Sequence, residues 1–224
     1  MVTKTLNSKA FVFDLDGTLI DTTPLVIKYW TDIAKEYNLD PSQILATSHG
    51  RRTIETLERW IPVLATKEYV NDLEARLCVI MEGVSVLPGV VDLLASIPNQ
   101  DWTVNTAGTH IMAITRLAQF GIHVPEKLAT GDKVNFGKPH PEGYLMAAEM
   151  INRDAKDCLA FEDAPAGVKA AIAAGMECVA CVTTHTIEQL KEAGATIIVN
   201  RLDSVRIEKQ EDGSYNTIIG NVIE

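Results

Sequence analysis

The sequence predicts an α/β protein: a Rossmann-like parallel sheet core with helices on both faces, plus an inserted α-helical cap. Short apolar runs alternate with helical patterns over most of the chain, which is typical of parallel strands joined by helices. Directly after the first strand, residues 24–85 break this alternation with helical periodicity and no convincing strand. We therefore expect a core of residues 1–21 and 86–224 and a cap of residues 22–85.

The core strands are predicted from short apolar runs, and the helices from amphipathic or alanine-rich stretches between them. The expected strands are 10–13, 102–106, 127–130, 158–161, 178–182 and 196–199, and the expected helices are 110–120, 141–150, 164–174 and 186–193. In the cap, helices are expected at 24–37, 53–60 and 67–81. Asp212-Gly213, between runs 206–209 and 215–219, predicts a hairpin with a two-residue turn.

Composition excludes several classes of function. The formal net charge of the 224 residues is -10, so the chain lacks the basic footprint of a nucleic-acid-binding protein. No apolar stretch reaches the roughly 18 residues of a membrane span, and the polar N-terminus does not resemble a signal peptide. Cys178 and Cys181 have metal-like spacing, but they lie in an apolar strand pattern without a second pair. We expect a cytoplasmic monomer without nucleic-acid or membrane partners.

Acidic side chains follow two of the predicted strands. In residues 11–18 (FVFDLDGT), Asp14 and Asp16 stand two residues apart, so both are expected to emerge together at the carboxyl end of the strand. Glu162 and Asp163 follow another apolar strand. A solvated turn, or a helix cap at Asp163, would use the same residue types. Together at one sheet edge, however, these four carboxylates favour a hard divalent cation such as Mg²⁺.

Two further segments are suited to binding phosphate. Thr106 to Thr109 (TAGT) follows a strand and opens a helix, so a hydroxyl group and free backbone N–H groups can hold phosphate oxygens there. Lys138, in the proline-flanked segment GKPHP, can bring a positive charge to a phosphoryl group. A simple N-cap and a solvated lysine remain the alternatives for these residues.

The chain resembles the haloacid dehalogenase superfamily nearly from end to end. The four motifs of that superfamily, in chain order, are matched by Asp14/Asp16, Thr106, Lys138 and Glu162-Asp163. The cap between the first two motifs resembles that of the β-phosphoglucomutase-like members. More narrowly, residues 48–53, 68–71, 137–142 and 161–167 look like the fungal glycerol-3-phosphatase and 2-deoxyglucose-6-phosphate phosphatase branch.

The resemblance implies a Mg²⁺-dependent phosphatase acting on a small sugar or polyol phosphate, such as glycerol 3-phosphate or 2-deoxyglucose 6-phosphate. Asp14 would be the nucleophile that forms an aspartyl-phosphate, and Asp16 would protonate the leaving oxygen and then deprotonate water. Asp14, the Asp16 carbonyl and Asp163 would hold Mg²⁺, with Glu162 a direct ligand or a residue behind the ligands. Thr106 and Lys138 would bind phosphoryl oxygens.

The resemblance also implies substrate contacts. The cap loop residues His49, Gly50 and Arg52 correspond to a substrate-specificity loop, and Ala107 and Gly108 lie beside Thr106. Asn105 and Ala107 depart from the family pattern, where an apolar or small residue and a Ser or Asn are usual. The backbone N–H of Ala107 remains available for phosphate.

Three other functions compete with this prediction. A phosphosugar mutase would carry a histidine at the position of Val26, and a metal-free dehalogenase would lack Asp16, so both residues favour hydrolysis of a phosphate ester. A catalytically silent regulatory or binding protein would usually have lost one of the catalytic groups, all of which are present here.

Overall fold

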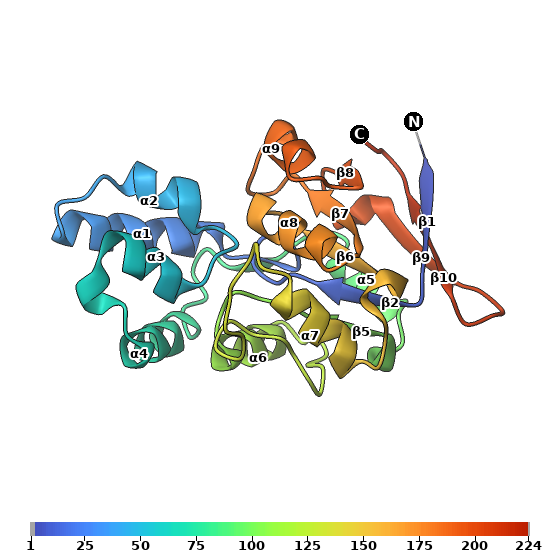
Figure 1. Cartoon of the computed structure of the whole chain (residues 1–224), viewed down its shortest axis with the longest axis horizontal. Coiled ribbons are helices and arrows are strands. Elements are labelled where there is room, and N and C mark those ends of the chain that lie inside the picture. Colours follow the sequence, from blue (N-terminus) through green and yellow to red (C-terminus); the bar gives the residue numbers. More distant parts are fainter. Residues whose placement is uncertain (1–2, 224) are drawn as a thin grey trace.

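The computed structural model describes residues 3–223 and consists of a sheet-centred core beside a helical block (Figure 1). The core sheet has five strands in the order β5-β2-β6-β7-β8, and all neighbouring pairs are parallel. The strands are β2 (Ala10–Phe13), β5 (Trp102–Val104), β6 (Cys158–Glu162), β7 (Glu177–Cys181) and β8 (Ile197–Val199). The α/β class predicted from the alternating pattern is confirmed.

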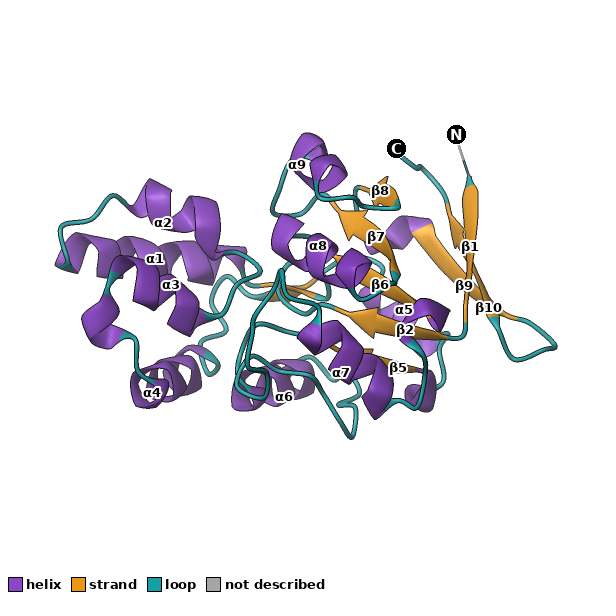
Figure 2. Cartoon of the chain, in the orientation of Figure 1, coloured by secondary structure: helices purple, strands orange, loops and turns teal. Residues whose placement is uncertain are grey.

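Alternate residues of the strands bury two separate apolar layers. Phe11 and Phe13 face one layer, whereas Ala10 and Val12 face the other, as the period of a strand requires. The first layer is covered by α5 (Val90–Ala95) and α6 (His110–Gln119), and the second by α7 (Glu142–Met150), α8 (Pro165–Ala173) and α9 (Ile187–Glu192). Figure 2 shows these helices around the strands. The sheet is therefore buried on both faces, which explains its nearly continuous apolar strands.

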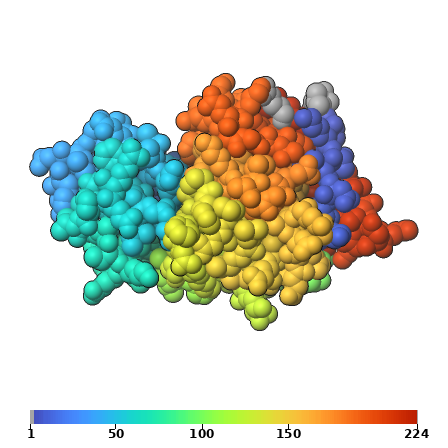
Figure 3. Space-filling model, viewed as in Figure 1, coloured from blue at the N-terminus to red at the C-terminus, as the bar shows by residue number. Residues whose placement is uncertain are grey.

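The helical block comprises α1 (Thr23–Glu36), α2 (Pro41–Ser48), α3 (Thr53–Trp60) and α4 (Lys67–Leu77). These helices share an apolar cluster of their own, with Trp30, Ile44 and Leu57 at its centre. The chain leaves and re-enters the core at one place, because β3 (Ile20–Asp21) pairs antiparallel with β4 (Ser85–Val86). In Figure 3 the block forms a lobe, coloured blue to cyan, that is pressed against the core.

Some elements differ from the expectations. Residues 127–130 form a single bridge between Ala129 and Asn105 instead of a strand. Helix α2 was not predicted, and α4 ends four residues earlier than expected, at Leu77. Short 3₁₀ helices, also not predicted, lie at Pro62–Leu64, Asn99–Asp101, Ala155–Asp157 and Leu202–Ser204. Within residues 3–223, no helix has both the length and the apolar character that a membrane span requires.

The structure also contains a second, antiparallel sheet of three strands, of which the sequence predicted only the hairpin. Its order is β1 (Lys4–Ser8), β10 (Tyr215–Ile219) and β9 (Val205–Lys209), so the predicted hairpin gains the N-terminal segment as a third strand. The prediction of a two-residue turn is wrong, because the loop between β9 and β10 spans residues 210–214. Within this loop, the Asp212 carboxylate accepts hydrogen bonds from Ser214, and Gln210 N donates to Ser214 O at 2.8 Å.

The second sheet is fastened to the core by a buried contact at Tyr215. The Tyr215 hydroxyl donates to Asp101 Oδ2 at 2.6 Å, and Arg153 donates to Asp101 Oδ1 at 3.0 Å. The Tyr215 ring packs edge-on against Phe11 with centroids 5.2 Å apart.

We predict that Tyr215→Phe lowers the free energy of unfolding by about 1–3 kcal/mol, because one buried oxygen of Asp101 loses its donor. Chemical denaturation measures the change. The hydrolysis expected from the sequence should keep its rate constants in the folded protein, because β10 lies at the end of the core away from the helical block (Figure 1). An unchanged free energy of unfolding would contradict the anchoring role of Tyr215.

Candidate active site

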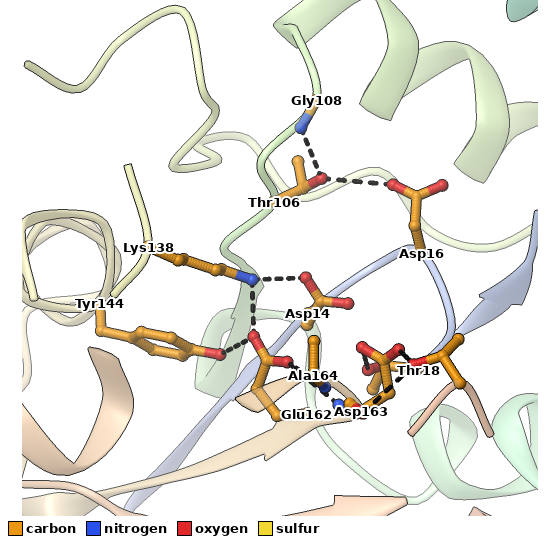
Figure 4. A network of polar contacts seen from close by, with 11 residues as sticks. Asp14, Asp16, Thr18, Thr106, Gly108, Lys138, Tyr144, Glu162, Asp163 and Ala164 are labelled. Atoms are coloured by element: carbon orange, nitrogen blue, oxygen red, sulfur yellow. Dashed lines mark hydrogen bonds and ion pairs between the residues drawn. The ribbon is translucent and has the colours of Figure 1, made fainter. Parts of the chain in front are cut away.

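Polar residues from four separate segments meet where the parallel strands end, on the side of the core that faces the helical block (Figure 4). Asp14 directly follows β2, Thr106 follows β5 by two residues, and Glu162 ends β6 with Asp163 next in the chain. Lys138 reaches the same place from the loop between α6 and α7. The edge of the sheet predicted from the strand pattern is therefore where these side chains gather.

Lys138 lies between two buried carboxylates. Its Nζ donates to Asp14 Oδ1 at 2.5 Å and to Glu162 Oε1 at 2.6 Å, and all three residues are at most 5% exposed. Burial alone would lower the pKa of Lys138, but the two carboxylates raise it above its ordinary value, so the ammonium stays charged. Burial raises the pKa of Asp14 to about 7, against the attraction of Lys138.

Glu162 is fully occupied by hydrogen bonds from the protein. Its Oε1 also accepts from the Tyr144 hydroxyl at 2.8 Å, and its Oε2 accepts from the backbone N–H groups of Asp163 and Ala164. Gly167 leaves room for this carboxylate, because a Cβ there would lie 1.8 Å from Glu162 Oε1. Glu162 therefore holds Lys138 in place, and its four hydrogen bonds use both of its carboxylate oxygens.

Asp14, Glu162 and Asp163 form an acidic cluster suited to a metal ion. One carboxylate oxygen from each lies within 4.8 Å of the others, and all three residues are buried. Asp14 Oδ2 is buried and has no hydrogen-bond partner among the described residues. Burial and the charges of Asp14 and Glu162 raise the pKa of Asp163 well above its usual range. Three carboxylates beside one ammonium leave excess negative charge, and oxygen donors of this kind suit a hard divalent cation.

The Asp16 carboxylate lies apart from this cluster. Asp16 Oδ1 accepts from the Thr22 hydroxyl at 2.8 Å, and Asp16 Oδ2 accepts from the Thr106 hydroxyl at 3.5 Å. Asp14 and Asp16 leave the same strand end, as expected, but their side chains have different partners: Asp14 accepts from Lys138, and Asp16 accepts from Thr22 and Thr106. The side chain of Asp16 is therefore no member of the acidic cluster. Burial raises its pKa, which favours a proton-carrying role.

A pocket of about 110 Å³ lies between the helical block and these residues. Asp14, Asp16 and Thr106 line it from the core. Four of the five predicted substrate contacts also line it: His49, Gly50, Ala107 and Gly108. The Gly108 N–H is turned toward the Thr106 hydroxyl, to which it donates at 3.0 Å.

Arg52, the fifth predicted substrate contact, is not among the residues that line this pocket. Its guanidinium donates to Glu55 Oε1, at 2.6 Å through Nη2, and to the carbonyl oxygens of Val134 and Asn135 in the core, at 3.0 and 3.1 Å. Its neighbour Arg51 lines the pocket instead. Arg52 thus ties the helical block to the core.

Several residues around the site were missed from the sequence. Glu74 and Arg116 are buried and line the pocket, while Tyr144 and Thr184 donate hydrogen bonds to Glu162 and Asp163. For Glu74 a signal existed: it shares a helix with the buried residues Val70 and Leu73, and a carboxylate among apolar positions requires a partner.

Comparison with known proteins agrees with this geometry. Residues 8–175 match the family model of haloacid dehalogenase-like hydrolases. Glycerol-1-phosphate phosphohydrolase 2 of Saccharomyces cerevisiae is 36% identical to this chain, and the alignment covers 96% of this chain and 90% of the yeast protein. 2-deoxyglucose-6-phosphate phosphatase 1 of the same yeast is 31% identical over 94% of both proteins.

A solved structure supports the same assignment. β-Phosphoglucomutase from Clostridium difficile superposes on this chain with a TM-score of 0.74 and 26% sequence identity. The match covers 89% of this chain and 93% of the mutase chain. The resemblance drawn from the motifs, including the branch of the yeast phosphatases, is confirmed. The chain therefore belongs to the haloacid dehalogenase-like hydrolases, and it is an enzyme of that family.

Proposed function

We propose that this enzyme is a Mg²⁺-dependent phosphatase that hydrolyses a small polyol or sugar phosphate through a phosphorylated Asp14. The observation that carries the proposal is the position of Asp14. Its Oδ1 is held by Lys138 at 2.5 Å, whereas Oδ2 has no hydrogen-bond partner in the described part of the chain, and the residue lines the pocket. One carboxylate oxygen is thereby fixed while the other remains available for the site's chemistry.

The carboxylates of Asp14 and Asp163 and the carbonyl of Asp16 are the groups that we propose to hold Mg²⁺. The bound ion supplies positive charge that offsets the repulsion between a carboxylate and a phosphate ester. Lys138 and Thr106, together with the N–H of Ala107, bind and orient the phosphoryl oxygens. Glu162 keeps Lys138 aligned and charged.

In the first step an oxygen of Asp14 forms a bond to phosphorus, and the bond from phosphorus to the alcohol oxygen breaks. Protonated Asp16 gives its proton to that departing oxygen. In the second step Asp16 takes a proton from water, the water oxygen bonds to phosphorus, and the bond between phosphorus and Asp14 breaks. Inorganic phosphate and free Asp14 result, and Asp16 is protonated again. The hydrogen bond from Thr22 keeps Asp16 beside the pocket for both transfers.

The size of the pocket favours the shorter substrates. An apolar cavity of about 150 Å³ holds one benzene ring, so a pocket of about 110 Å³ suits a short carbon chain better than a hexose ring. We therefore favour a glycerol phosphate over 2-deoxyglucose 6-phosphate. Val26 lines this pocket where a mutase would carry a histidine, which favours transfer to water over return to a sugar.

We propose that residues 22–85 act as a cap that closes the pocket. Gly50, at the tip of the loop between α2 and α3, touches the core: a Cβ on Gly50 would lie 2.7 Å from Ala164 Cβ. Closure excludes water and limits the substrate to small molecules. A cytoplasmic location is also proposed, because all four cysteines are free and buried. The monomeric state stays a prediction.

We predict that Asp14→Asn lowers kcat by at least about 1000-fold with any phosphate ester that the wild type hydrolyses, because the nucleophile is lost. A panel of sugar and polyol phosphates assayed with Mg²⁺ measures this. Acid-quenched wild-type enzyme should carry a phosphoryl adduct on the peptide that contains Asp14. The control Asp32→Asn changes an exposed carboxylate of α1. Normal turnover by Asp14→Asn would refute the mechanism.

Removal of the metal should abolish hydrolysis reversibly. We predict loss of activity in excess chelator and recovery on adding Mg²⁺. Calorimetry without substrate should show that Asp163→Asn weakens Mg²⁺ binding by at least about tenfold, since a proposed ligand is lost. The exposed Asp154→Asn should bind normally. Full activity in excess chelator is the outcome that would rule out a metal requirement.

Gly50→Ala should lower kcat/KM by about 10- to 100-fold, because its methyl group would hold the cap away from Ala164. Gly121→Ala is a matched control: Gly121 has a similar φ (+66° against +72°), but a Cβ there would have no atom of the described residues within 4 Å. The control should lose stability without losing activity. Adding Ala164→Gly to Gly50→Ala should restore activity, and failure of this rescue would argue against the contact as the cause.

A further inference from the structure

We propose that Glu74 determines which phosphate esters the enzyme accepts, by filling a second anion-binding position in the pocket with a carboxylate of the cap. The substrate is then restricted to monophosphates whose far end is an uncharged hydroxyl-bearing group. This inference rests on the proposed phosphatase function and names the substrate class of the same site.

Glu74 crosses from the cap to the core. Glu74 lies on α4, is 3% exposed, and lines the pocket together with Asp14 and Asp16. Its Oε2 accepts from the backbone N–H of Thr109 at 2.7 Å, and its Oε1 accepts from the Thr53 hydroxyl at 2.7 Å. The carboxylate is the hydrogen-bond acceptor in both contacts, so its ionised form is stabilised. Burial raises the pKa of Glu74, and these two donors act in the opposite direction.

The partner of Glu74 is the start of a core helix. Thr109 is the N-cap of α6, a ten-residue helix that begins just after the phosphate-binding turn at Thr106. Helix N-termini attract anions through free N–H groups and the helix dipole. Here the chain's own carboxylate occupies that position. A carboxylate or second phosphate on the substrate would find the Thr109 N–H in use and a negative charge beside it.

Arg116, a buried cation that lines the pocket, has few hydrogen-bond donors left for a second anion. Arg116 donates through Nη2 to Leu77 O, at the end of α4, and through Nη1 to Ile80 O in the segment after it, both at 2.8 Å. Nη1 also donates to Gln119 Oε1 at 3.1 Å. Its Nε is buried and has no hydrogen-bond partner within residues 3–223. Arg51, which also lines the pocket, is exposed.

A neutral hydroxyl group suits this surrounding better than an anion. A carboxylate has about four lone-pair directions, of which Thr109 and Thr53 use two, so Glu74 can accept further hydrogen bonds from substrate hydroxyls. The Nε–H of Arg116 can donate to the same groups. The pocket thus contains one place for phosphate, near Lys138 and Thr106, and one for the hydroxyls of a polyol.

The test compares two substrates that differ at the far end, which is an uncharged hydroxymethyl group in glycerol 3-phosphate and a carboxylate in the 3-phosphate ester of glyceric acid. The wild type should prefer the glycerol ester by at least about 100-fold in kcat/KM. Glu74→Gln, which keeps the shape but removes the charge, should reduce this preference at least about tenfold, mainly by improving turnover of the glycerate ester. Glu74→Asp, which keeps the charge, should retain most of the preference.

Glu68→Gln is the matched control, because it removes the same charge from an exposed position on the same helix. It should leave the preference unchanged. An unchanged preference in Glu74→Gln, or a parallel loss with both esters, would overturn the inference and leave Glu74 as a structural contact of the cap. Comparable wild-type kcat/KM values for the two esters would overturn it even if Glu74→Gln failed to fold. Wild-type enzyme that hydrolyses neither these nor any other small ester would instead refute the proposed phosphatase function.

Discussion

The contact of Lys138 with Asp14 and Glu162 is the constraint on which the rest of the site depends. Three carboxylates, those of Asp14, Glu162 and Asp163, are buried at one edge of the sheet, and Lys138 is the ammonium group that touches two of them. Burying like charges together is unfavourable without compensating cations, and one ammonium compensates only part of the charge. The remaining negative charge makes the site suited to a divalent ion.

The fold supplies that surrounding from elements far apart in the sequence. Parallel strands bring Asp14 and Glu162 to the same edge, and Gly167 in α8 leaves space for the Glu162 carboxylate. The cap then completes the pocket through contacts in both directions. Glu74 of α4 occupies the N-terminus of α6, while Arg116 of α6 binds a carbonyl oxygen at the end of α4. In the proposed closure of the cap, these contacts would couple access of the substrate to the shape of its binding site.

Much of the core and its acidic edge could be predicted from the sequence, because apolar strands with carboxylates at their ends reflect local periodicity. Contacts between distant segments could not. Strand β1 has a polar sequence and exists because it pairs with β10, at the other end of the chain. The alternation of side-chain directions along β2 ends with the strand at Phe13, so the strand pattern could not predict where the Asp16 side chain points. Arg51 and Arg52 are adjacent, and only the packing of the cap decides that Arg51 lines the pocket while Arg52 ties cap to core.

The most direct test of the excess buried charge is a crystal structure of the enzyme grown with Mg²⁺. One ion should be bound by carboxylate oxygens of Asp14 and Asp163 at about 2.1 Å, with Glu162 still hydrogen-bonded to Lys138. A structure at saturating Mg²⁺ with no ion between Asp14 and Asp163, or with Lys138 displaced from both of its carboxylates, would contradict this description of the site.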